Sequence, residues 1–284
     1  FEFKMWRARL LGQLSPERAA QLFTDHRAGG LLIIPTGGSF EGQSSDASDL
    51  RHVIPSSSFA TTSDSEPIDA GSNNWALAGT RTASGRPLLA GDPHRGPDTP
   101  NVYYQNHVSC PQFDVVGVSF PGAPGFPHFG HNSRVCWGVT HTGADYQDLY
   151  IERFKEGDPD YYEFKGDWMK AEVRPEVLKV RGAKDIHITV TSTHHDPVIA
   201  GEPAKGQGLA FQYTQTAGHN KSAEAILQML WAKSTLELDE SMRQWTDPVN
   251  NFVFADIEGN IGYLTRGQIP IRSQANAWLP VPGW

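Results

Sequence analysis

The sequence has little of what marks cystine-rich, membrane-spanning or nucleic-acid-binding proteins. Two of its 284 residues are cysteine, too few for a disulfide framework or an all-cysteine zinc site. The longest apolar run, Leu31 to Pro35, is far too short to span a bilayer. A net charge of −8 without a basic stripe argues against nucleic acid and anionic membranes as partners. No glycine-rich phosphate loop occurs, so nothing supports nucleotide binding.

The two cysteines, Cys110 and Cys136, lie in apolar, strand-like stretches. We therefore expect buried free thiols, with a single disulfide as the alternative in an oxidising compartment. The first residues, Phe1 to Arg7, lack the apolar segment of a signal peptide. The chain also begins without Met and ends without a capping or polar terminus, which predicts a piece of a longer protein.

Glycine, proline and aromatic residues are plentiful, as in a β-rich chain with many turns: 28 Gly, 20 Pro, 8 Trp, 8 Tyr and 14 Phe. Apolar alternation predicts strands, beginning with 75–79, 87–90, 102–108, 113–118, 135–140 and 148–154. A meander over about 161–190 and a hairpin of 251–255 with 261–264 follow. Two helices are expected, 222–230 and one that starts at the capping box Ser234-Thr-Leu-Glu237 and ends near Trp245. The fold class is α+β with mostly antiparallel pairing.

The first 71 residues differ from the rest. Residues 1–24 have helical character, because Ser15-Pro16-Glu17 supplies an N-cap, a proline at the first helical position and an acid in the first turn. Residues 38–71 are rich in Ser, Thr, Asp, Gly and Pro and show no periodicity. This length without periodicity predicts a linker or a removable segment.

Gly71-Ser72-Asn73-Asn74-Trp75 stands between that polar segment and the first clear strand. A serine at such a boundary suggests a chain cut before Ser72, which frees the serine as a nucleophile. The alternative is an ordinary turn, since Ser and Asn favour turns by hydrogen bonding to nearby backbone.

Two other candidate sites are weaker. Gly117-Val-Ser119-Phe-Pro-Gly122 lacks the second glycine of a G-x-S-x-G nucleophile elbow in register. His194-His195-Asp196 suggests a metal site, but adjacent residues of an extended segment point to opposite faces and do not easily share one ion. We expect a turn there instead.

Several blocks in one order carry a resemblance to a known family. They are Ser72-Asn-Asn-Trp75, Gly91-Asp-Pro-His94, Phe120-Pro-Gly122, Gly130-His-Asn132, Trp137-Gly-Val-Thr140, Gly143-Ala-Asp145-Tyr-Gln-Asp148-Leu-Tyr150, Asn251-Phe-Val-Phe-Ala-Asp256 and Gly259-Asn-Ile-Gly-Tyr263. Together they resemble the penicillin acylase (penicillin amidase) family, a member of the N-terminal nucleophile (Ntn) hydrolases. The resemblance covers residues 72–284, and Arg7-Ala-Arg-Leu-Leu-Gly with Pro16 to Phe23 resembles the end of the family's small α subunit.

The resemblance implies a part of an αββα four-layer sandwich with antiparallel sheets. Residues 1–24 would be the helical tail of the α subunit, 25–71 a spacer, and 72–284 the first part of the β subunit. The precursor would cut itself at Gly71-Ser72, where a glycine lets the backbone reach a strained geometry. Ser72 would then serve as nucleophile, and its own α-amine, with a reference pKa of about 7.7–8.0, as base.

The family also implies an oxyanion hole, in which each donor is worth about 2.7–4 kcal/mol. His94 would supply a donor through its backbone or its ring, and His141 would supply its backbone N–H. A third donor, an asparagine side chain, would fall roughly thirty residues beyond Trp284 on the family's register. We therefore expect this chain alone to be catalytically incomplete.

Two residues bear on substrate binding. Phe129 matches an aromatic wall of the acyl pocket, with a plain core phenylalanine as the alternative. Arg95 departs from the family, in which an apolar residue usually follows the histidine. An arginine there would favour an acid-bearing acyl group or simply point to solvent, and it puts phenylacetyl-type specificity in doubt.

Asp145, Asp148 and the carbonyl of Gln147 match a calcium-binding stretch of the family, and Ala277 matches a further carbonyl donor. Calcium needs six to eight oxygen ligands, and the alternative is a pair of exposed aspartates on a loop. Calcium would be structural, since the resemblance implies no cofactor for catalysis.

The expected function is that of an amidohydrolase that cleaves linear carboxamides, such as a penicillin side chain. One alternative is an acylase of N-acyl-homoserine lactones, and another is an unprocessed or truncated precursor without activity. The expected partners are a small amide substrate and the remainder of the protein's own α/β heterodimer, without nucleic acid or membrane. Because members of this family are usually exported, the resemblance implies a periplasmic or secreted protein.

Overall fold

The computed structural model describes residues 2–11, 14, 18, 71–96, 99–122, 128–272, 276 and 279–284. They divide into two compact units. One holds the N-terminal helix with Gln147–Tyr213 and the described part of Ile271–Trp284. It is called here the charged unit because it buries charged side chains. The other holds 71–146 and Thr214–Pro270, and is called the serine unit because it contains Ser72.

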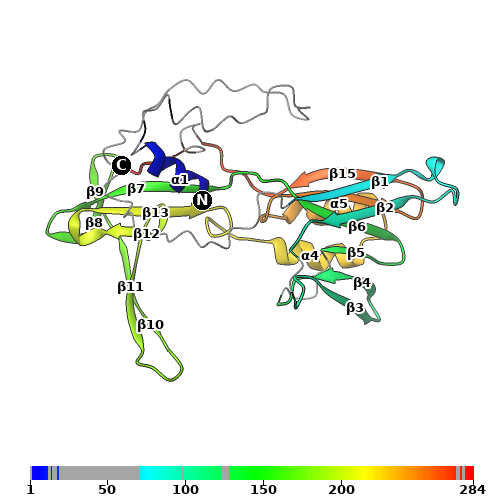
Figure 1. The fold of residues 1–284 in the computed structure, drawn as a ribbon, viewed down its shortest axis with the longest axis horizontal. Helices are drawn as coiled ribbons and strands as arrows, with labels where there is room; N and C mark the ends of the chain where they lie inside the picture. Colours follow the sequence, from blue (N-terminus) through cyan, green and yellow to red (C-terminus); the bar gives the residue numbers. More distant parts are fainter. Residues whose placement is uncertain are drawn as a thin grey trace. The chain divides into compact units, whose positions relative to one another are not determined.

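The serine unit is built on a six-stranded antiparallel sheet with the order β15-β14-β6-β5-β4-β3 (Figure 1). These strands are β3 (Tyr104–Cys110), β4 (Phe113–Ser119), β5 (Phe129–His131), β6 (Val135–His141), β14 (Asn250–Asp256) and β15 (Ile261–Arg266). A separate antiparallel pair consists of β1 (Ser72–Leu77) and β2 (Leu88–Pro93), with a short 3-10 turn at Gly79–Arg81 between them. Ser72, the predicted nucleophile, is therefore the first residue of a strand.

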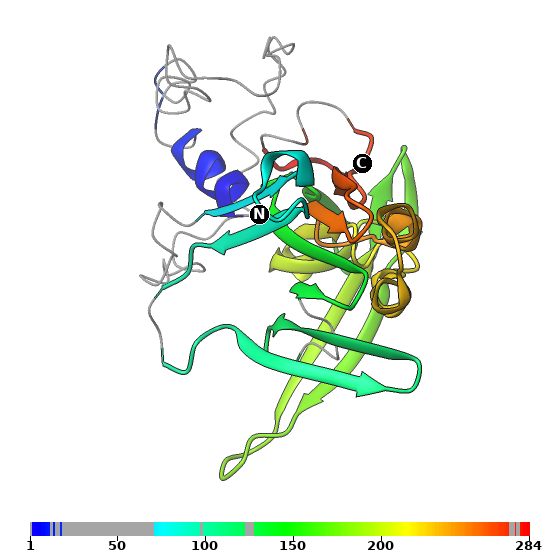
Figure 2. The ribbon, with the colours of Figure 1, turned by 90° about the vertical axis from the view of Figure 1, so that its right-hand side faces the viewer.

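The two faces of strand β6 bury different partners. Trp137 and Val139 pack with the helices α4 (Ser222–Trp231) and α5 (Thr235–Ser241), through Met229 and Leu238 among others. Figure 2 shows these two helices side by side, nearly end-on. Gly138, on the opposite face, approaches Asn74 of β1. The described residues of the serine unit thus form three layers: the β1-β2 pair, the six-stranded sheet, and the helices α4 and α5.

The charged unit contains an eight-stranded sheet. Seven strands follow the order β10-β11-β12-β13-β7-β8-β9, and β16 pairs with β7 in parallel. Their bounds are β7 (Gln147–Lys155), β8 (Asp158–Phe164), β9 (Asp167–Lys170), β10 (Glu172–Leu178), β11 (Ile186–Thr193), β12 (Asp196–Glu202), β13 (Gln207–Tyr213) and β16 (Val281–Pro282), with a 3-10 turn at Pro203–Lys205. The β10-β11 hairpin projects from this sheet (Figure 1).

Helix α1 (Glu2–Leu11) covers part of the sheet of the charged unit. Its residues Met5 and Ala8 pack against Leu149, Ile151 and Leu209 in one apolar cluster. Lys4 lies on the same side of the helix and is 2% exposed. The predicted helix of residues 1–24 is therefore present over Glu2–Leu11, and its proposed N-cap at residues 15–17 lies outside the described residues, as does the spacer up to residue 70.

Most predicted elements are confirmed, including the capping box, in which Ser234 Oγ accepts from the Glu237 amide at 3.2 Å. Helix α5 ends at Ser241 and continues as a 3-10 turn to Gln244. One expectation about burial is wrong. Both cysteines are free thiols, but Cys110 is exposed, because it ends β3 at the edge of the sheet, and Cys136 is half-buried. None of the described helices has the length and hydrophobicity to cross a bilayer.

Candidate functional site

Ser72 begins strand β1 and lies opposite Pro93 of β2 in the antiparallel register. The turn that was the alternative for Ser72-Asn-Asn is therefore wrong, and the strand begins three residues before the predicted start at Trp75. The cause is long-range, because β2 continues to pair with β1 as far as Pro93. Half-buried and exposed residues alternate along β1, so that Ser72 and Asn74 share the more buried face.

The carbonyl oxygen of the peptide bond between Gly71 and Ser72 accepts a hydrogen bond. The backbone N–H of His94 donates to the Gly71 carbonyl oxygen at 2.9 Å. The imidazole of His94 also lies against Gly71, since a Cβ atom at that position would be 3.2 Å from Nδ1. A glycine at 71 thus leaves room for the histidine beside the bond predicted to be cut. The resemblance implied a cleavage site at Gly71-Ser72 and an oxyanion donor at His94, and the structure brings Gly71 and His94 together.

The ring of His94 is oriented by two neighbours. Its Nε2 lies 3.0 Å from Asn73 Nδ2 and 3.3 Å from Asp92 Oδ2. An unprotonated Nε2 accepts from Asn73, whereas a protonated one donates to Asp92. Both partners and the ring are exposed, so these contacts orient the ring more than they stabilise the fold.

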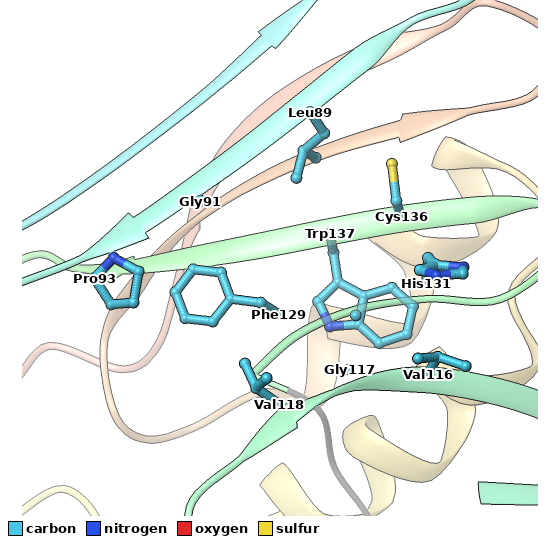
Figure 3. Close-up of a pocket in the computed structure, with 11 residues that line it drawn as sticks. Leu89, Gly91, Pro93, Val116, Gly117, Val118, Phe129, His131, Cys136 and Trp137 are labelled. Atoms are coloured by element: carbon cyan, nitrogen blue, oxygen red, sulfur yellow. The ribbon is translucent and has the colours of Figure 1, made fainter. Parts of the chain in front are cut away.

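A cavity of about 370 Å³ opens beside the β1-β2 pair. Its lining comes from β2, β4, β5 and β6: Leu89, Gly91, Pro93, Val116, Gly117, Val118, Phe129, Gly130, His131, Cys136 and Trp137. Figure 3 shows the Phe129 ring directed toward Pro93, with His131 and Cys136 at the other end. Because Pro93 is the strand partner of Ser72, the cavity lies next to the strand that carries the serine. Its size is within the range of small-molecule sites.

Phe129 both lines this cavity and packs against the core. Its role as an aromatic wall of the acyl pocket stays a prediction. Its ring occupies space that two glycines leave open, since Cβ atoms at Gly91 and Gly138 would lie 2.4 and 3.2 Å from Cδ1. The Asn74 carboxamide shares this space, with Oδ1 at 3.2 Å from both Cβ positions. Neither polar atom of Asn74 has a hydrogen-bond partner among the described residues, although both are buried. Sequence reasoning missed Asn74 because it placed the start of the strand after this residue.

Arg95 does not line the cavity. It is exposed, and its guanidinium lies over the Phe120 ring at 5.9 Å, which agrees with the solvent-facing alternative. Phe120 in turn contacts His128 edge to face at 4.5 Å. Burial, together with the charge of Arg95, lowers the pKa of His128 to about 4, so this histidine is neutral at neutral pH. The sequence analysis did not single out His128, because no motif or periodicity around this residue indicates that it is partly buried.

His141 ends strand β6 opposite Asn250 of β14. Its Nδ1 lies 3.3 Å from the Asn250 Oδ1, and its ring meets Tyr146 edge to face at 6.4 Å. The role of its backbone N–H as an oxyanion donor stays a prediction.

Two of the groups expected to bind calcium, the Asp148 carboxylate and the Gln147 carbonyl, have cationic side chains as partners instead. Asp148 is buried, and its two carboxylate oxygens are taken by Lys4 Nζ at 2.8 Å and Arg272 Nη1 at 3.0 Å. Lys4 Nζ also donates to the carbonyl oxygen of Gln147. The side chains of Lys4 and Arg272 thus occupy the oxygen atoms that a calcium ion would need as ligands. Asp145 is half-buried in the other unit, and Ala277 lies outside the described residues.

The turn expected at His194-His195 is confirmed, and Asp196 follows it with a positive φ of 71°. The expectation that the two rings point apart is wrong, because the turn brings their centroids to 3.6 Å. One ligand atom each from His194, His195 and the buried Glu152 lies within 4.8 Å of the others. The family resemblance assigns no role to this cluster.

Comparison with known proteins decides the family. The sequence profile of the penicillin amidase family matches residues 1–284. The chain belongs to the penicillin amidase family. It is 40% identical over 283 residues to the penicillin acylase 2 proenzyme of Pseudomonas sp. (strain SE83), covering 99% of this chain and 36% of that protein. It is 33% identical over 228 residues to the acyl-homoserine lactone acylase QuiP of Pseudomonas aeruginosa, covering 76% and 27%.

The fold agrees with this membership. A thermostable penicillin G acylase from Alcaligenes faecalis superposes with a TM-score of 0.65 at 27% identity, over 74% of this chain and 38% of that one. The fold class is therefore the Ntn-hydrolase fold, with antiparallel sheets as predicted. The family needs no catalytic cofactor. The chain spans about a third of the length of the curated relatives it matches.

Proposed function

We propose that the protein is an acylase that hydrolyses linear carboxamides after cutting its own chain between Gly71 and Ser72. The observation that carries the proposal is the hydrogen bond from the His94 N–H to the Gly71 carbonyl oxygen, 2.9 Å long. A carbonyl that accepts such a bond is polarised toward attack, and the same donor stabilises the negative charge that forms on its oxygen. The serine whose hydroxyl would attack is the next residue.

The cut would proceed in two steps. Ser72 Oγ adds to the Gly71 carbonyl carbon, and the C–N bond breaks as the proton of the hydroxyl passes to the amine, which leaves an ester. Water then cleaves the ester and gives a Gly71 carboxylate and a Ser72 with a free amine and a free hydroxyl. The freed amine has a reference pKa of about 7.7–8.0 and can act as the base for its own hydroxyl.

Amide hydrolysis would use the same groups a second time. Ser72 Oγ attacks the substrate carbonyl, the amine product leaves, and water releases the acid from the acyl-enzyme. The His94 N–H, which held the Gly71 oxygen, becomes available to the substrate oxygen once the chain is cut. The His141 N–H would be a second donor, and no step uses a metal ion.

The acyl group would occupy the cavity beside Pro93, with Phe129 as its aromatic wall. The membership of the family and the 40% identity to a penicillin acylase proenzyme support an amide of the penicillin side-chain type. The 33% identity to QuiP supports an acyl-homoserine lactone as the second candidate. The remaining partner would be the rest of the α/β heterodimer. We also propose export to the periplasm or medium, which cell fractionation checks.

The test is a burst experiment with the full-length protein and a chromogenic phenylacetamide. We expect a burst of the coloured amine equal to the enzyme concentration in wild type and none in Ser72→Ala. Equal turnover by both proteins would refute the serine mechanism, and absence of turnover in both would favour an inactive precursor. Relative rates on a phenylacetyl amide and on long-chain acyl-homoserine lactones separate the two substrate classes.

A further inference from the structure

The charged unit contains a second cluster of chemically active side chains, formed by Glu152 of β7 with His194 and His195 of the β11-β12 turn. Glu152 is 0% exposed. Its Oε1 lies 2.8 Å from His195 Nδ1 and accepts a hydrogen bond from Thr193 Oγ1 at 2.7 Å. All of these residues belong to the same unit, so the geometry of the cluster does not depend on the placement of the other unit.

The carboxylate of Glu152 is incompletely compensated. Its Oε2 is buried and has no hydrogen-bond partner among the described residues. The backbone of Gly283 lies directly over this oxygen, since a Cβ atom at that position would be 2.4 Å away. Buried charges in proteins are normally paired with full hydrogen bonding or bound to a metal ion. The unpartnered oxygen therefore points to a missing positive charge at this cluster.

The two histidines are held in place for binding. The His195 ring stacks on Tyr150 with the planes 4° apart, and the His194 ring stacks on Tyr162 with the planes 13° apart. Tyr162 also accepts a hydrogen bond from the His194 amide at 3.0 Å. His194 is exposed and leaves a path from solvent.

We propose that Glu152, His194 and His195 bind one divalent transition-metal ion of the zinc class. Two imidazoles and one carboxylate are a common ligand set for Zn²⁺, with water or another ligand in the fourth position. Bond lengths of about 2.0–2.2 Å put tetrahedral ligand atoms roughly 3.4 Å apart. The present separation of up to 4.8 Å therefore closes with a small inward turn of the exposed His194 ring.

Thr193 is the residue that positions these ligands. Its hydroxyl donates to Glu152 Oε1 and accepts from the His195 amide at 3.0 Å, so it fixes both the carboxylate and the turn. Groups of this kind behind metal ligands are typically worth about 10- to 100-fold in metal affinity. The ion would fasten the β11-β12 turn to β7.

The test is titration of the full-length protein with Co²⁺ and Zn²⁺, after purification without a histidine tag and treatment with EDTA. We expect one Co²⁺ per chain, with visible absorption bands that Zn²⁺ abolishes, and an increase in Tm with Zn²⁺. His194→Ala and His195→Gln should lose the bands, and Thr193→Val should weaken binding by about 10- to 100-fold. His187→Gln is the matched control, because His187 is an exposed histidine on the same β11 strand.

The proposal is overturned if wild type binds no Co²⁺ at one equivalent, or if His194→Ala binds as tightly as His187→Gln. Since the His194 ring is exposed, His194→Ala is expected to fold even where His195→Gln does not, and far-UV circular dichroism of each variant checks this. The titration is independent of amidase activity, so it stands or falls separately from the proposed hydrolysis.

Discussion

Two buried aspartates, one in each unit, are compensated in different ways. In the charged unit, Asp148 is held by two cations, Lys4 and Arg272. In the serine unit, Asp256 is held by uncharged donors: the amide and hydroxyl of Thr235 at 3.1 and 3.0 Å, and the amide and side chain of Asn260 at 3.0 and 2.9 Å. Burial acts to raise the pKa of Asp256, but these hydrogen bonds outweigh it and lower the value.

Asp148 and Asp256 each belong to a sequence block that resembles the family, but their different partners give them different structural roles. Asp256 joins the start of α5 to the β14-β15 turn and has a local role in the architecture of the serine unit. Asp148 ties helix α1 to β7 across 144 residues of sequence. Since Lys4 belongs to the segment predicted as the α-subunit tail, the ion pair would still hold the two subunits together after a cut at Gly71-Ser72.

The substitution Lys4→Met should have the largest effect on stability. Loss of one partner leaves a buried charge, and we expect the free energy of unfolding to fall by about 3–5 kcal/mol. Urea denaturation measures it. Lys179→Met, at an exposed lysine of the same unit, should change stability by less than about 0.5 kcal/mol. Addition of Ca²⁺ should not raise the Tm of wild type. A clear increase in Tm that Asp148→Asn abolishes would show that Asp148 binds calcium.

The serine unit should respond most to pH, through His128. Its folded pKa of about 4 lies below the ordinary 6.5, so the unfolded chain binds more protons between these values. Stability should therefore decrease as the pH falls from about 6.5 to 4, by up to about 3 kcal/mol. Denaturant titrations of wild type and His128→Gln across this range test it. The same pH dependence in both proteins would rule out His128 as the cause.

A smaller effect is expected for Asp256→Ala, because its partners carry no charge. The loss of hydrogen bonds to a carboxylate should lower the free energy of unfolding by about 2 kcal/mol. Glu258→Ala, at an exposed neighbour, serves as the control. An effect larger than that of Lys4→Met would reverse the ranking of the two kinds of compensation.

The smallest change concerns function. Phe129→Leu should raise KM for an aromatic acyl amide by about 10-fold, the cost of lost contacts in an apolar pocket, with a stability change below about 1.5 kcal/mol. Phe154→Leu in the charged unit, at a buried residue that does not line the cavity, should leave KM unchanged. An equal KM effect from both substitutions would make Phe129 a plain core residue.

Local patterns in the sequence predicted most of the fold. Alternation located the strands, and Ser234 with Glu237 located the start of α5, since both signals act over a few residues. What the sequence could not predict depends on pairing across the sheets. Lys4 meets Asp148 only because α1 packs on β7, and His194 meets Glu152 only because the turn folds over the same strand. Exposure of Cys110 follows from the edge position of β3, which no local pattern reveals.

The proposed cut makes Ser72 the first residue of a new chain. Intact mass spectrometry of the purified full-length protein, for wild type and Ser72→Ala side by side, tests it most directly. We expect wild type to yield a fragment whose mass corresponds to a chain that begins at Ser72, and Ser72→Ala to stay uncut at this bond. A single uncut chain in wild type, or cleavage before residue 72 that persists in Ser72→Ala, would contradict it.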